Sequence, residues 1–198
     1  YVTGNTAIDA LKTTVRENYT HPELEWARDS RLIMITAHRR ENLGEPMCHM
    51  FKAIRRVMDE HPDVKAIYPI HMNPVVRETA NEYLGDDDRI HIIEPLDVLD
   101  FHNFLSRSYL ILTDSGGIQE EAPSLGKPVL VMRDTTERPE GIAAGTLKLV
   151  GTEEETIYKE FSRLLSDKDE YEAMSKASNP YGDGQACKRI ADILEEKL

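Results

Sequence analysis

Short apolar runs alternate with longer amphipathic stretches along most of the chain from Arg31 onward. Each short run predicts a buried strand, whereas the longer stretches repeat apolar residues three and four positions apart, as a helix with one buried face does. Strands that alternate with helices run parallel and are covered on both faces. The pattern therefore predicts a doubly wound, Rossmann-like α/β fold.

The individual elements follow from this pattern and from its breakers. We expect strands at Leu32–Thr36, Val64–Ile70, Ile90–Ile93, Tyr109–Thr113, Pro128–Met132 and Leu147–Val150. We expect one helix to open at Pro46 and others to span Pro74–Leu84, Val98–Arg107, Gly117–Leu125, Asp169–Ala177 and Gln185–Lys197. A further helix follows the last strand, and the spacing of Thr152 and Glu155 predicts a capping box in front of it.

The composition fits one packed domain. The chain has 198 residues, of which 40% are hydrophobic and 30% charged. No apolar run approaches the roughly 20 residues of a membrane-spanning helix, and the start lacks a signal-peptide pattern, so we expect a cytoplasmic protein without a membrane partner. Cys48 and Cys187 have no second Cys or paired His at metal-ligand spacing, which predicts free thiols and no metal site.

The charge balance narrows the choice of ligand. A formal net charge of -12 at pH 7 argues against nucleic acid as a partner, because phosphate backbones bind to dense basic surfaces. A small anionic ligand stays compatible with this charge. Such a ligand responds to the local field of its pocket, which a few arginines and helix N-termini determine.

Ligands of doubly wound folds bind outside the carboxyl ends of the strands, so the loops that follow the strands are the expected site. These loops are Ala37–Glu45, His71–Pro74, Glu94–Asp97, Asp114–Gly117 and Arg133–Gly145. The last is a long polar loop, a kind that is commonly functional in compact domains, although a merely solvated loop fits as well.

The turn Asp114-Ser115-Gly116-Gly117 lies between a predicted strand and a predicted helix. Its glycines could bring backbone N–H groups against a phosphate, but a glycine pair after a strand is more often only a tight turn. In the following helix, Glu120 or Glu121 could accept hydrogen bonds from both hydroxyls of a ribose. The alternative is that both carboxylates lie on a solvated helix face. Without further support, two adjacent carboxylates favour this alternative.

The loop Thr36–Asn42 is harder to explain by folding alone. It places His38, Arg39 and Arg40 together at a strand end, where guanidinium groups could neutralise a diphosphate and an imidazole could donate to a phosphate or move a proton. His71 follows another strand, next to an Asn-Pro helix start, and a ligand role for it is about as well supported as an incidental one. The other histidines have no visible partner and receive no role.

In these motifs the chain resembles the non-hydrolysing UDP-N-acetylglucosamine 2-epimerases, in particular bacillus-like bacterial members. The matching regions cover essentially the whole chain, in the family's order, and are Thr3–Thr6, Thr36–Asn42, His71–Pro74, Asp114–Leu125 and Thr135–Glu140. The resemblance implies two Rossmann-like domains in the GT-B arrangement, with the active site between them.

The resemblance further implies that this chain is the C-terminal, UDP-binding domain, because it begins at Tyr1 without an initiator Met and because the family places Thr3–Thr6 at the domain connection. We therefore expect residues 1–20 to form the connection and the first helix. Residues 21–180 would form the Rossmann-like domain, and residues 181–198 a helix that returns to the N-terminal domain. The full-length protein would be a homodimer that serves cell-wall polysaccharide biosynthesis.

Carried over by resemblance, Ser115, Gly116 and Gly117 would hold the diphosphate of UDP-N-acetylglucosamine (UDP-GlcNAc). Glu121, rather than Glu120, would hold the ribose.

The remaining substrate contacts come from other loops. Phe101 and the Pro95-Leu96 backbone would hold the uracil. His38 and Arg138 would face the diphosphate and the sugar, with His38 as the catalytic residue of this domain. Arg39 and His71 would form its share of an allosteric site for a second UDP-GlcNAc.

The implied reaction eliminates UDP to leave a 2-acetamidoglucal and then adds UDP back with the opposite configuration at C2, giving UDP-N-acetylmannosamine (UDP-ManNAc). It needs no NAD and no metal. The carboxylates that move the C2 proton would belong to the N-terminal domain, so this chain alone would bind UDP weakly and without turnover. The alternatives are a hydrolysing epimerase that releases UDP and N-acetylmannosamine (ManNAc), a GT-B glycosyltransferase, and a non-catalytic binding module.

Overall fold

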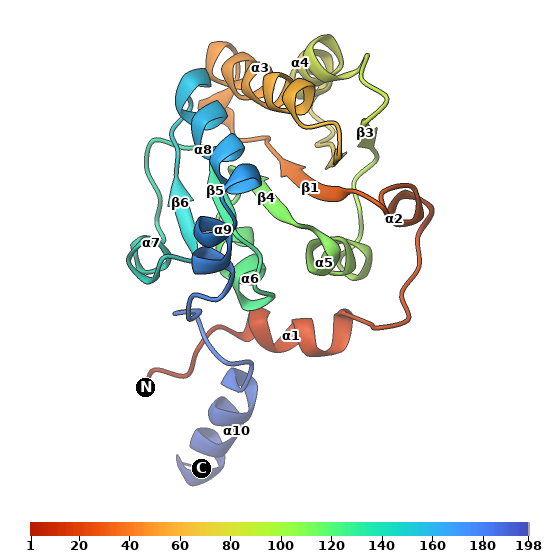
Figure 1. Ribbon diagram of the computed structural model, residues 1–198. Helices are drawn as coiled ribbons and strands as arrows, with labels where there is room; N and C mark the ends of the chain where they lie inside the picture. Colours follow the sequence, from red (N-terminus) through yellow and green to blue (C-terminus); the bar gives the residue numbers. More distant parts are fainter. Residues whose placement is uncertain (198) are drawn as a thin grey trace.

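A parallel sheet of six strands runs through the middle of the computed structural model, which describes residues 1–197. The strand order is β3-β2-β1-β4-β5-β6 (Figure 1). The strands are β1 (Arg31–Thr36), β2 (Val64–Pro69), β3 (Ile90–Ile93), β4 (Leu110–Thr113), β5 (Val129–Val131) and β6 (Leu147–Leu149). All predicted strands are present, so the doubly wound α/β fold is confirmed.

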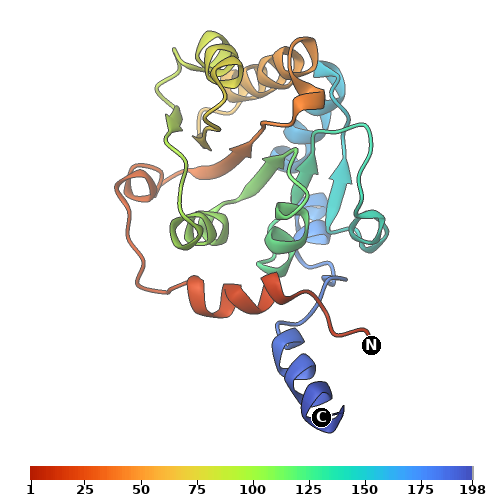
Figure 2. The same ribbon diagram turned by 180° about the vertical axis from the view of Figure 1, so that it is seen from behind.

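Helices cover both faces of the sheet (Figures 1 and 2). One face carries α3 (Glu45–Glu60), α4 (Pro74–Leu84) and α8 (Glu154–Ser166), and α8 leads into α9 (Lys168–Ser175). The opposite face carries α5 (Val98–Arg107) and α6 (Ile118–Ser124). Shorter helices lie at the margins, namely the 3-10 turn η1 (Arg40–Asn42), α2 (Pro22–Trp26) and α7 (Pro139–Ala144).

The central strand β1 shows why an uninterrupted apolar run is needed here. Ile33 and Ile35 pack into the core beneath α3, α4 and α8, whereas Leu32 and Met34 pack into the core beneath α5 and α6. Successive side chains of a strand point to opposite faces, so a strand covered on both sides must be apolar at every position. The sheet therefore separates two hydrophobic cores.

The order in which strands are added to the sheet changes side between β1 and β4, although all strands stay parallel. From β1 the chain moves outward to β2 and β3, then returns to place β4 on the other side of β1, paired in register from Ile33–Leu110 to Thr36–Thr113. In open α/β sheets this switch point forms a crevice at the carboxyl ends of the strands. The loops that follow β1 and β4 are consequently neighbours in space.

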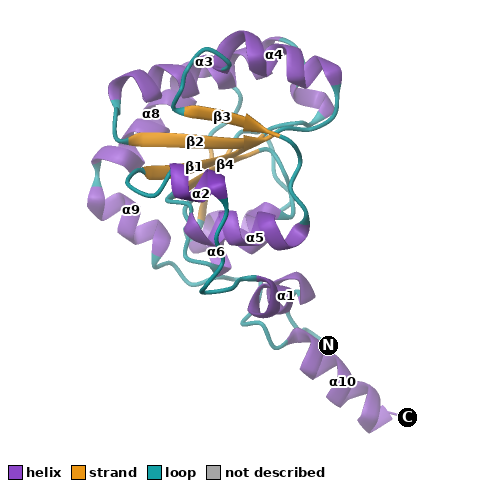
Figure 3. Cartoon of the chain, turned by 90° about the vertical axis from the view of Figure 1, so that its right-hand side faces the viewer, coloured by secondary structure: helices purple, strands orange, loops and turns teal. Residues whose placement is uncertain are grey.

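The two ends of the chain lie together below the sheet. Helix α1 (Thr6–Thr14) packs on α5 and α6, and α10 (Ala186–Lys197) extends away from the body beside it (Figure 3). Asp9 of α1 accepts hydrogen bonds from the first backbone N–H groups of α10, those of Ala186 (3.1 Å) and Cys187 (2.7 Å), and these bonds lower the pKa of the Asp9 carboxyl. The outer face of α10 leaves Ile190 and Leu194 exposed.

Two predictions about local structure were wrong. The loop Arg133–Gly145 contains α7, which starts with Pro139 and ends at Gly145 in the left-handed conformation (φ 75°). Its six residues are too few for a periodic pattern, although proline at the start and glycine at the end were available signals. The capping box also fails, because α8 is capped at Glu153 without a side-chain hydrogen bond and Thr152 is buried instead.

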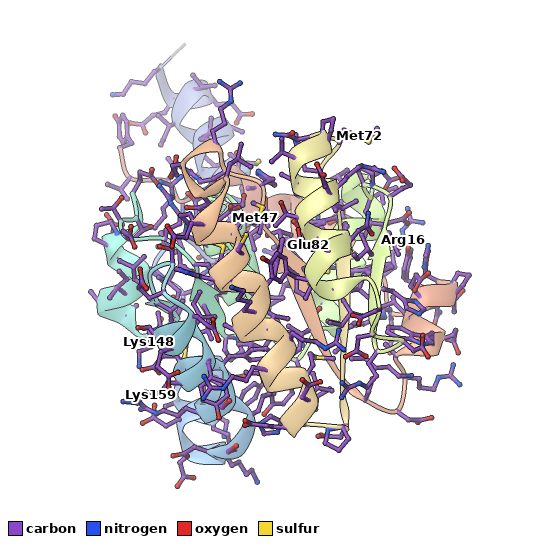
Figure 4. The ribbon with its side chains drawn as sticks, turned by 90° about the horizontal axis from the view of Figure 1, so that it is seen from above. Arg16, Met47, Met72, Glu82, Lys148 and Lys159 are labelled. Carbon is purple, nitrogen blue, oxygen red and sulfur yellow. The ribbon has the colours of Figure 1, made fainter. Side chains whose placement is uncertain are left out.

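We predict that Phe161→Ala lowers the free energy of unfolding by about 3–5 kcal/mol, because Phe161 is fully buried between α8 and the sheet and its removal leaves a cavity. Urea denaturation measures the loss. Lys159→Ala on the exposed side of the same helix (Figure 4) is the control and should stay within about 0.5 kcal/mol of the parent. Equal effects of the two changes would contradict the assignment of this face of α8 to the core.

Candidate functional site

The site begins where β1 and β4 end side by side. The hydroxyls of Thr36 and Thr113 lie 2.6 Å apart and are buried, and the backbone N–H of Asp114 donates to the Thr36 carbonyl (3.0 Å). Thr113 also accepts from the backbone N–H of Ser115 (2.9 Å). Two β-branched hydroxyl residues thus continue the strand pairing into the first residues of both loops.

Asp114 connects the two loops through its side chain. One carboxylate oxygen, Oδ2, accepts from the backbone N–H groups of His38 (2.9 Å) and Arg39 (2.8 Å) and from the Asn42 amide (3.1 Å). The residue is completely buried, and its other oxygen has no hydrogen-bond partner among residues 1–197. Because a buried carboxylate is stable only with such donors, the loop after β1 must fold around Asp114.

Further bonds hold the same loop from other sides. The Arg39 Nε–H donates to the Asp114 carbonyl (2.8 Å), and the Tyr68 hydroxyl of β2 donates to the Ala37 carbonyl. Burial, together with the nearby Asp114 carboxylate, raises the pKa of Tyr68, so the phenol keeps the proton that it donates. His38 is therefore presented from a fixed backbone.

A pocket of about 480 Å³ lies at this edge of the sheet. It combines an apolar wall with a few polar groups, as small-molecule sites do. Its lining residues are Thr36, His38, Pro69, Ile70, His71, Met72, Pro95, Leu96, Phe101, Ser115, Gly117, Ile118 and Glu121. Figure 4 labels Met72 just before α4 and Met47 in the first turn of α3, so both helices begin at this end of the sheet.

The glycine turn is open toward solvent. A Cβ atom on Gly117 would lie 4.0 Å from Glu121 Oε1, and one on Gly116 would lie 3.9 Å from the Arg39 guanidinium. Neither glycine has a positive φ, so the fold itself does not require glycine at either position. The space above the turn instead allows a ligand to approach the backbone N–H groups there, as phosphates do at the start of a helix.

The two adjacent glutamates of α6 have different surroundings. Glu121 lines the pocket, whereas Glu120 is buried and is bound by the Arg138 guanidinium and by the Asn5 side-chain amide. Glu121 is therefore the carboxylate that a ligand in the pocket can reach. Glu120 instead connects α6 to the start of the chain, since Asn5 also caps α1 through Ala7.

His38 and His71 face each other at the rim of the pocket. Their ring centroids are 5.2 Å apart and both side chains are exposed. They come from the loops after β1 and β2, which are adjacent strands. Two imidazoles that converge from neighbouring loops can share contact with one anionic group.

Arg39 and Arg138, the arginines predicted to contact ligands, lie outside the pocket and bind carboxylates. Arg138 pairs with Glu120, and Arg39 pairs with Glu41 (3.1 Å). Arg133, which is buried, makes a bidentate pair with Glu137 (2.7 and 2.8 Å), and this pair lowers the pKa of Glu137 to about 2. Acidic partners inside this chain thus neutralise the guanidinium groups of Arg39, Arg133 and Arg138.

The structure brings most of the predicted site residues together. His38, His71, Leu96, Phe101, Ser115, Gly117 and Glu121 all line the pocket. Gly116, Arg39 and Arg138 do not line it, although Gly116 belongs to the same turn and lies beside Arg39. The ligand roles given to all of these residues stay predictions.

Sequence reasoning overlooked Asp114 as the residue that fixes the loop with His38, and it gave His102 no role. A charged residue directly after a predicted buried strand was the available signal for Asp114. The bond from Asp114 to His38 joins residues 76 positions apart, and no local pattern reveals such a partner. His102, buried on α5 beside Glu121, was equally invisible for this reason.

Within residues 1–197, no group of three or more His, Cys, Asp or Glu side chains is placed to hold a metal ion. In the same part of the chain, none of the helices has the length and apolar character needed to cross a membrane.

The structure is that of a doubly wound α/β domain with an open glycine turn beside an apolar pocket at its switch point, the place where domains of this class bind their ligands. The family follows from comparison with known proteins. A family model described as UDP-N-acetylglucosamine 2-epimerase matches residues 1–195. The chain belongs to this family, which confirms the resemblance found in its motifs.

Individual relatives agree with this assignment. The UDP-N-acetylglucosamine 2-epimerase of Bacillus subtilis is 66% identical over 98% of this chain and 51% of that protein. A co-structure of S. aureus MnaA with UDP superimposes with a TM-score of 0.96 at 57% identity, covering 99% of this chain and 54% of the other. The UDP-GlcNAc 2-epimerase from Neisseria meningitidis, solved bound to UDP-GlcNAc, gives a TM-score of 0.89 at 44% identity, covering 98% and 54%. The chain spans about half the length of these relatives.

We predict that Asp114→Ala lowers the free energy of unfolding by about 1–3 kcal/mol, because it leaves the part-buried N–H donors of His38 and Arg39 and the buried amide of Asn42 without this acceptor. Asp114→Asn keeps one acceptor oxygen and should lose less. Urea denaturation of both variants gives the comparison. A stability unchanged in Asp114→Ala would show that the loop does not depend on this carboxylate.

Proposed function

We propose that this chain is the C-terminal, nucleotide-binding half of a non-hydrolysing UDP-GlcNAc 2-epimerase, an isomerase that interconverts UDP-GlcNAc and UDP-ManNAc. The observation that carries the proposal is the convergence of an open glycine turn, a carboxylate and an apolar wall in one pocket. UDP offers a matching diphosphate, ribose and base. Membership of the epimerase family supports the same ligand.

The proposed pose follows the chemistry of the lining. The diphosphate lies on Ser115, Gly116 and Gly117, where the backbone N–H groups of the two glycines and the Ser115 hydroxyl can donate to it. The ribose hydroxyls donate to Glu121. A volume of about 480 Å³ is in the range of small-molecule sites, roughly 300–1,000 Å³.

The base takes the apolar end of the pocket. Phe101, Leu96 and Pro95 line this end, and an aromatic ring beside a flat base contributes stacking as well as burial. The Pro95-Leu96 backbone supplies the polar contacts that orient the uracil. His38 lies at the other end of the pose, beside the diphosphate and the sugar.

The reaction explains why the nucleotide is held so closely. The hydrogen at C2 of the sugar is not adjacent to a carbonyl, so direct removal of the proton is unfavourable. In the proposed route the C1–O bond to UDP breaks and the C2 proton leaves, giving UDP and 2-acetamidoglucal. UDP then bonds again to C1 while a proton returns to the opposite face of C2.

This chain contributes leaving-group stabilisation. Negative charge develops on the diphosphate as the C1–O bond breaks, and donors fixed in advance lower the energy of that transition state. The donors are the glycine turn and His38, whose backbone Asp114 holds in place. Arg138 could join them by exchanging Glu120 for the diphosphate. The carboxylates that move the C2 proton belong to the other half of the protein.

A second UDP-GlcNAc is proposed to bind at the rim as an allosteric activator, with Arg39 and His71 as its contacts on this chain. His71 lies across from His38, so the two ligands would be neighbours. Arg39 lies beside Gly116, on the outer side of the glycine turn. These positions support an activator that touches the substrate's diphosphate end.

The proposal extends to the rest of the protein. Residues 1–20 form the connection to an N-terminal domain in a GT-B arrangement, residues 21–180 form the UDP-binding domain, and residues 181–198 return toward the N-terminal domain. The exposed Ile190 and Leu194 of α10 support this arrangement, since a second domain would cover them. The whole protein is proposed to be a cytoplasmic homodimer in cell-wall polysaccharide biosynthesis.

The decisive test uses a two-domain protein that contains this chain, incubated with UDP-GlcNAc and followed by NMR. We expect UDP-ManNAc to accumulate until the two sugar nucleotides reach equilibrium. The 198-residue chain alone should give no turnover, since it lacks the proton-transferring carboxylates. Free ManNAc and UDP as the products would instead identify a hydrolysing enzyme, and a product that needs an acceptor would identify a glycosyltransferase.

A second prediction separates binding from folding at the glycine turn. Gly117→Ala should change the free energy of unfolding by less than about 1 kcal/mol, because φ is -64° and the new methyl group would meet nothing closer than 4.0 Å. It should weaken UDP binding by about tenfold or more, since the methyl group occupies the approach to the backbone N–H groups. Isothermal titration calorimetry and urea denaturation of the 198-residue chain measure the two effects. An unchanged affinity for UDP would show that the diphosphate does not bind at this turn.

A further inference from the structure

A buried histidine lies behind the proposed ribose carboxylate. His102 of α5 is 4% exposed and does not line the pocket. Its Nε2 atom lies 3.7 Å from Glu121 Oε2, and its Nδ1 atom lies 2.8 Å from the Thr14 hydroxyl of α1. The imidazole thus connects α1 to the carboxylate that faces the ligand.

The end of α1 is fixed on α5 by the residue next to His102. Asn103, which is fully buried, donates to the Thr14 carbonyl (2.8 Å) and accepts from the Arg16 backbone N–H (2.9 Å). The position of the Thr14 hydroxyl relative to the imidazole is therefore set by the backbone. Three successive residues of α5 have separate tasks, since Phe101 lines the pocket, His102 contacts Glu121 and Asn103 holds α1.

The surroundings assign the imidazole tautomer. A ring nitrogen that faces a carboxylate is favourable only when it carries the proton, so Nε2–H points toward Glu121. Nδ1 then accepts the single proton of the Thr14 hydroxyl (2.8 Å), for which the Ala10 carbonyl at 3.0 Å is the alternative acceptor. The separation of 3.7 Å is longer than a direct hydrogen bond, but in a buried setting an N–H dipole still attracts the negative carboxylate.

The two oxygens of Glu121 thereby receive different environments. Oε2 lies on the side of His102, whereas Oε1 lies on the side of the glycine turn, 4.0 Å from the place of a Gly117 Cβ. A carboxylate held from behind keeps its open oxygen toward the pocket. Without that hold, the side chain of a glutamate has several rotamers of similar energy and spends less time in the binding orientation.

We propose that His102 is a positioning residue for ribose recognition: it holds the Glu121 carboxylate toward the ligand, and Thr14 of α1 fixes its ring. This inference rests on the proposed function, because it takes a nucleotide ribose as the ligand of Glu121. The effect is specific. A nucleotide without ribose hydroxyls makes no use of Glu121, so its affinity does not depend on His102.

The experiment compares UDP with 2′,3′-dideoxy-UDP on the 198-residue chain by isothermal titration calorimetry. The parent chain should bind UDP more tightly than the dideoxy nucleotide. His102→Phe keeps an aromatic ring but removes both nitrogens, and it should weaken UDP binding about fivefold while leaving dideoxy-UDP unchanged. His102→Gln, which restores an N–H donor, should recover part of the loss.

Thr14→Val tests the same link without changing the buried ring. It removes the hydroxyl that fixes Nδ1 and should weaken UDP binding in the same direction by a smaller factor. Thr13→Val is the matched control, because the Thr13 hydroxyl is exposed and, among the residues that the structure describes, bonds only to the Ala10 carbonyl (2.9 Å). It should leave both affinities unchanged.

Each other outcome overturns the inference. Equal weakening of both nucleotides in His102→Phe would make His102 a structural residue only, and no weakening of either would make it irrelevant to binding. Both results leave the proposed function standing, because the parent chain still prefers UDP. If the parent chain bound neither nucleotide, or bound both equally, Glu121 would not be the ribose ligand. The proposed UDP pose would then be wrong.

Discussion

The site depends on one buried carboxylate at the switch point of the sheet. Parallel pairing of β1 with β4 brings their loops together, but pairing ends at Thr36 and Thr113 and does not define the loops beyond. Asp114 defines them, because its Oδ2 gathers donors from His38, Arg39 and Asn42. A buried acceptor with several donors is costly to disrupt, so the loop with His38 and the glycine turn behave as one unit.

A network of hydrogen-bonded polar side chains connects the two loops to the rest of the site. Gln119 donates to the Ser115 carbonyl (3.0 Å) and accepts from the Thr136 hydroxyl (2.5 Å), so the glycine turn is tied to the loop before α7. On the next residue of α6, Glu120 binds Arg138 and Asn5. The start of the chain, α6 and the loop before α7 are therefore connected behind the pocket. Of the residues that line the pocket, His38 and Gly117 are exposed and Ser115 and Glu121 are half-buried, whereas Asp114, Gln119 and Glu120 behind them are buried.

The sequence predicted the fold well and the site in part, and the difference has a physical cause. Strands covered on both faces leave an unmistakable apolar run, and the position of the glycine turn after β4 follows from βαβ order alone. The roles of Asp114 and His102 come from bonds between residues 76 and 88 positions apart, which no periodic pattern encodes. The choice of Glu121 over Glu120 came from the family resemblance. In the structure Glu121 lines the pocket, whereas Glu120 is bound by Arg138.

The charge distribution explains why half of a two-domain protein would be a weak binder of a dianionic group. The net charge is -12, and Arg39, Arg138 and Arg133 are already bound by Glu41, Glu120 and Glu137 respectively. A diphosphate that recruits Arg138 must replace a partly buried ion pair, so the gain is the difference between two charge-assisted contacts rather than the whole of one. The contacts that a diphosphate can make without replacing an ion pair are those with the backbone N–H groups of the glycine turn and with His38. In the proposed two-domain protein, further cationic groups from the other domain would strengthen binding, and nucleotide affinity would then be coupled to closure of the two domains.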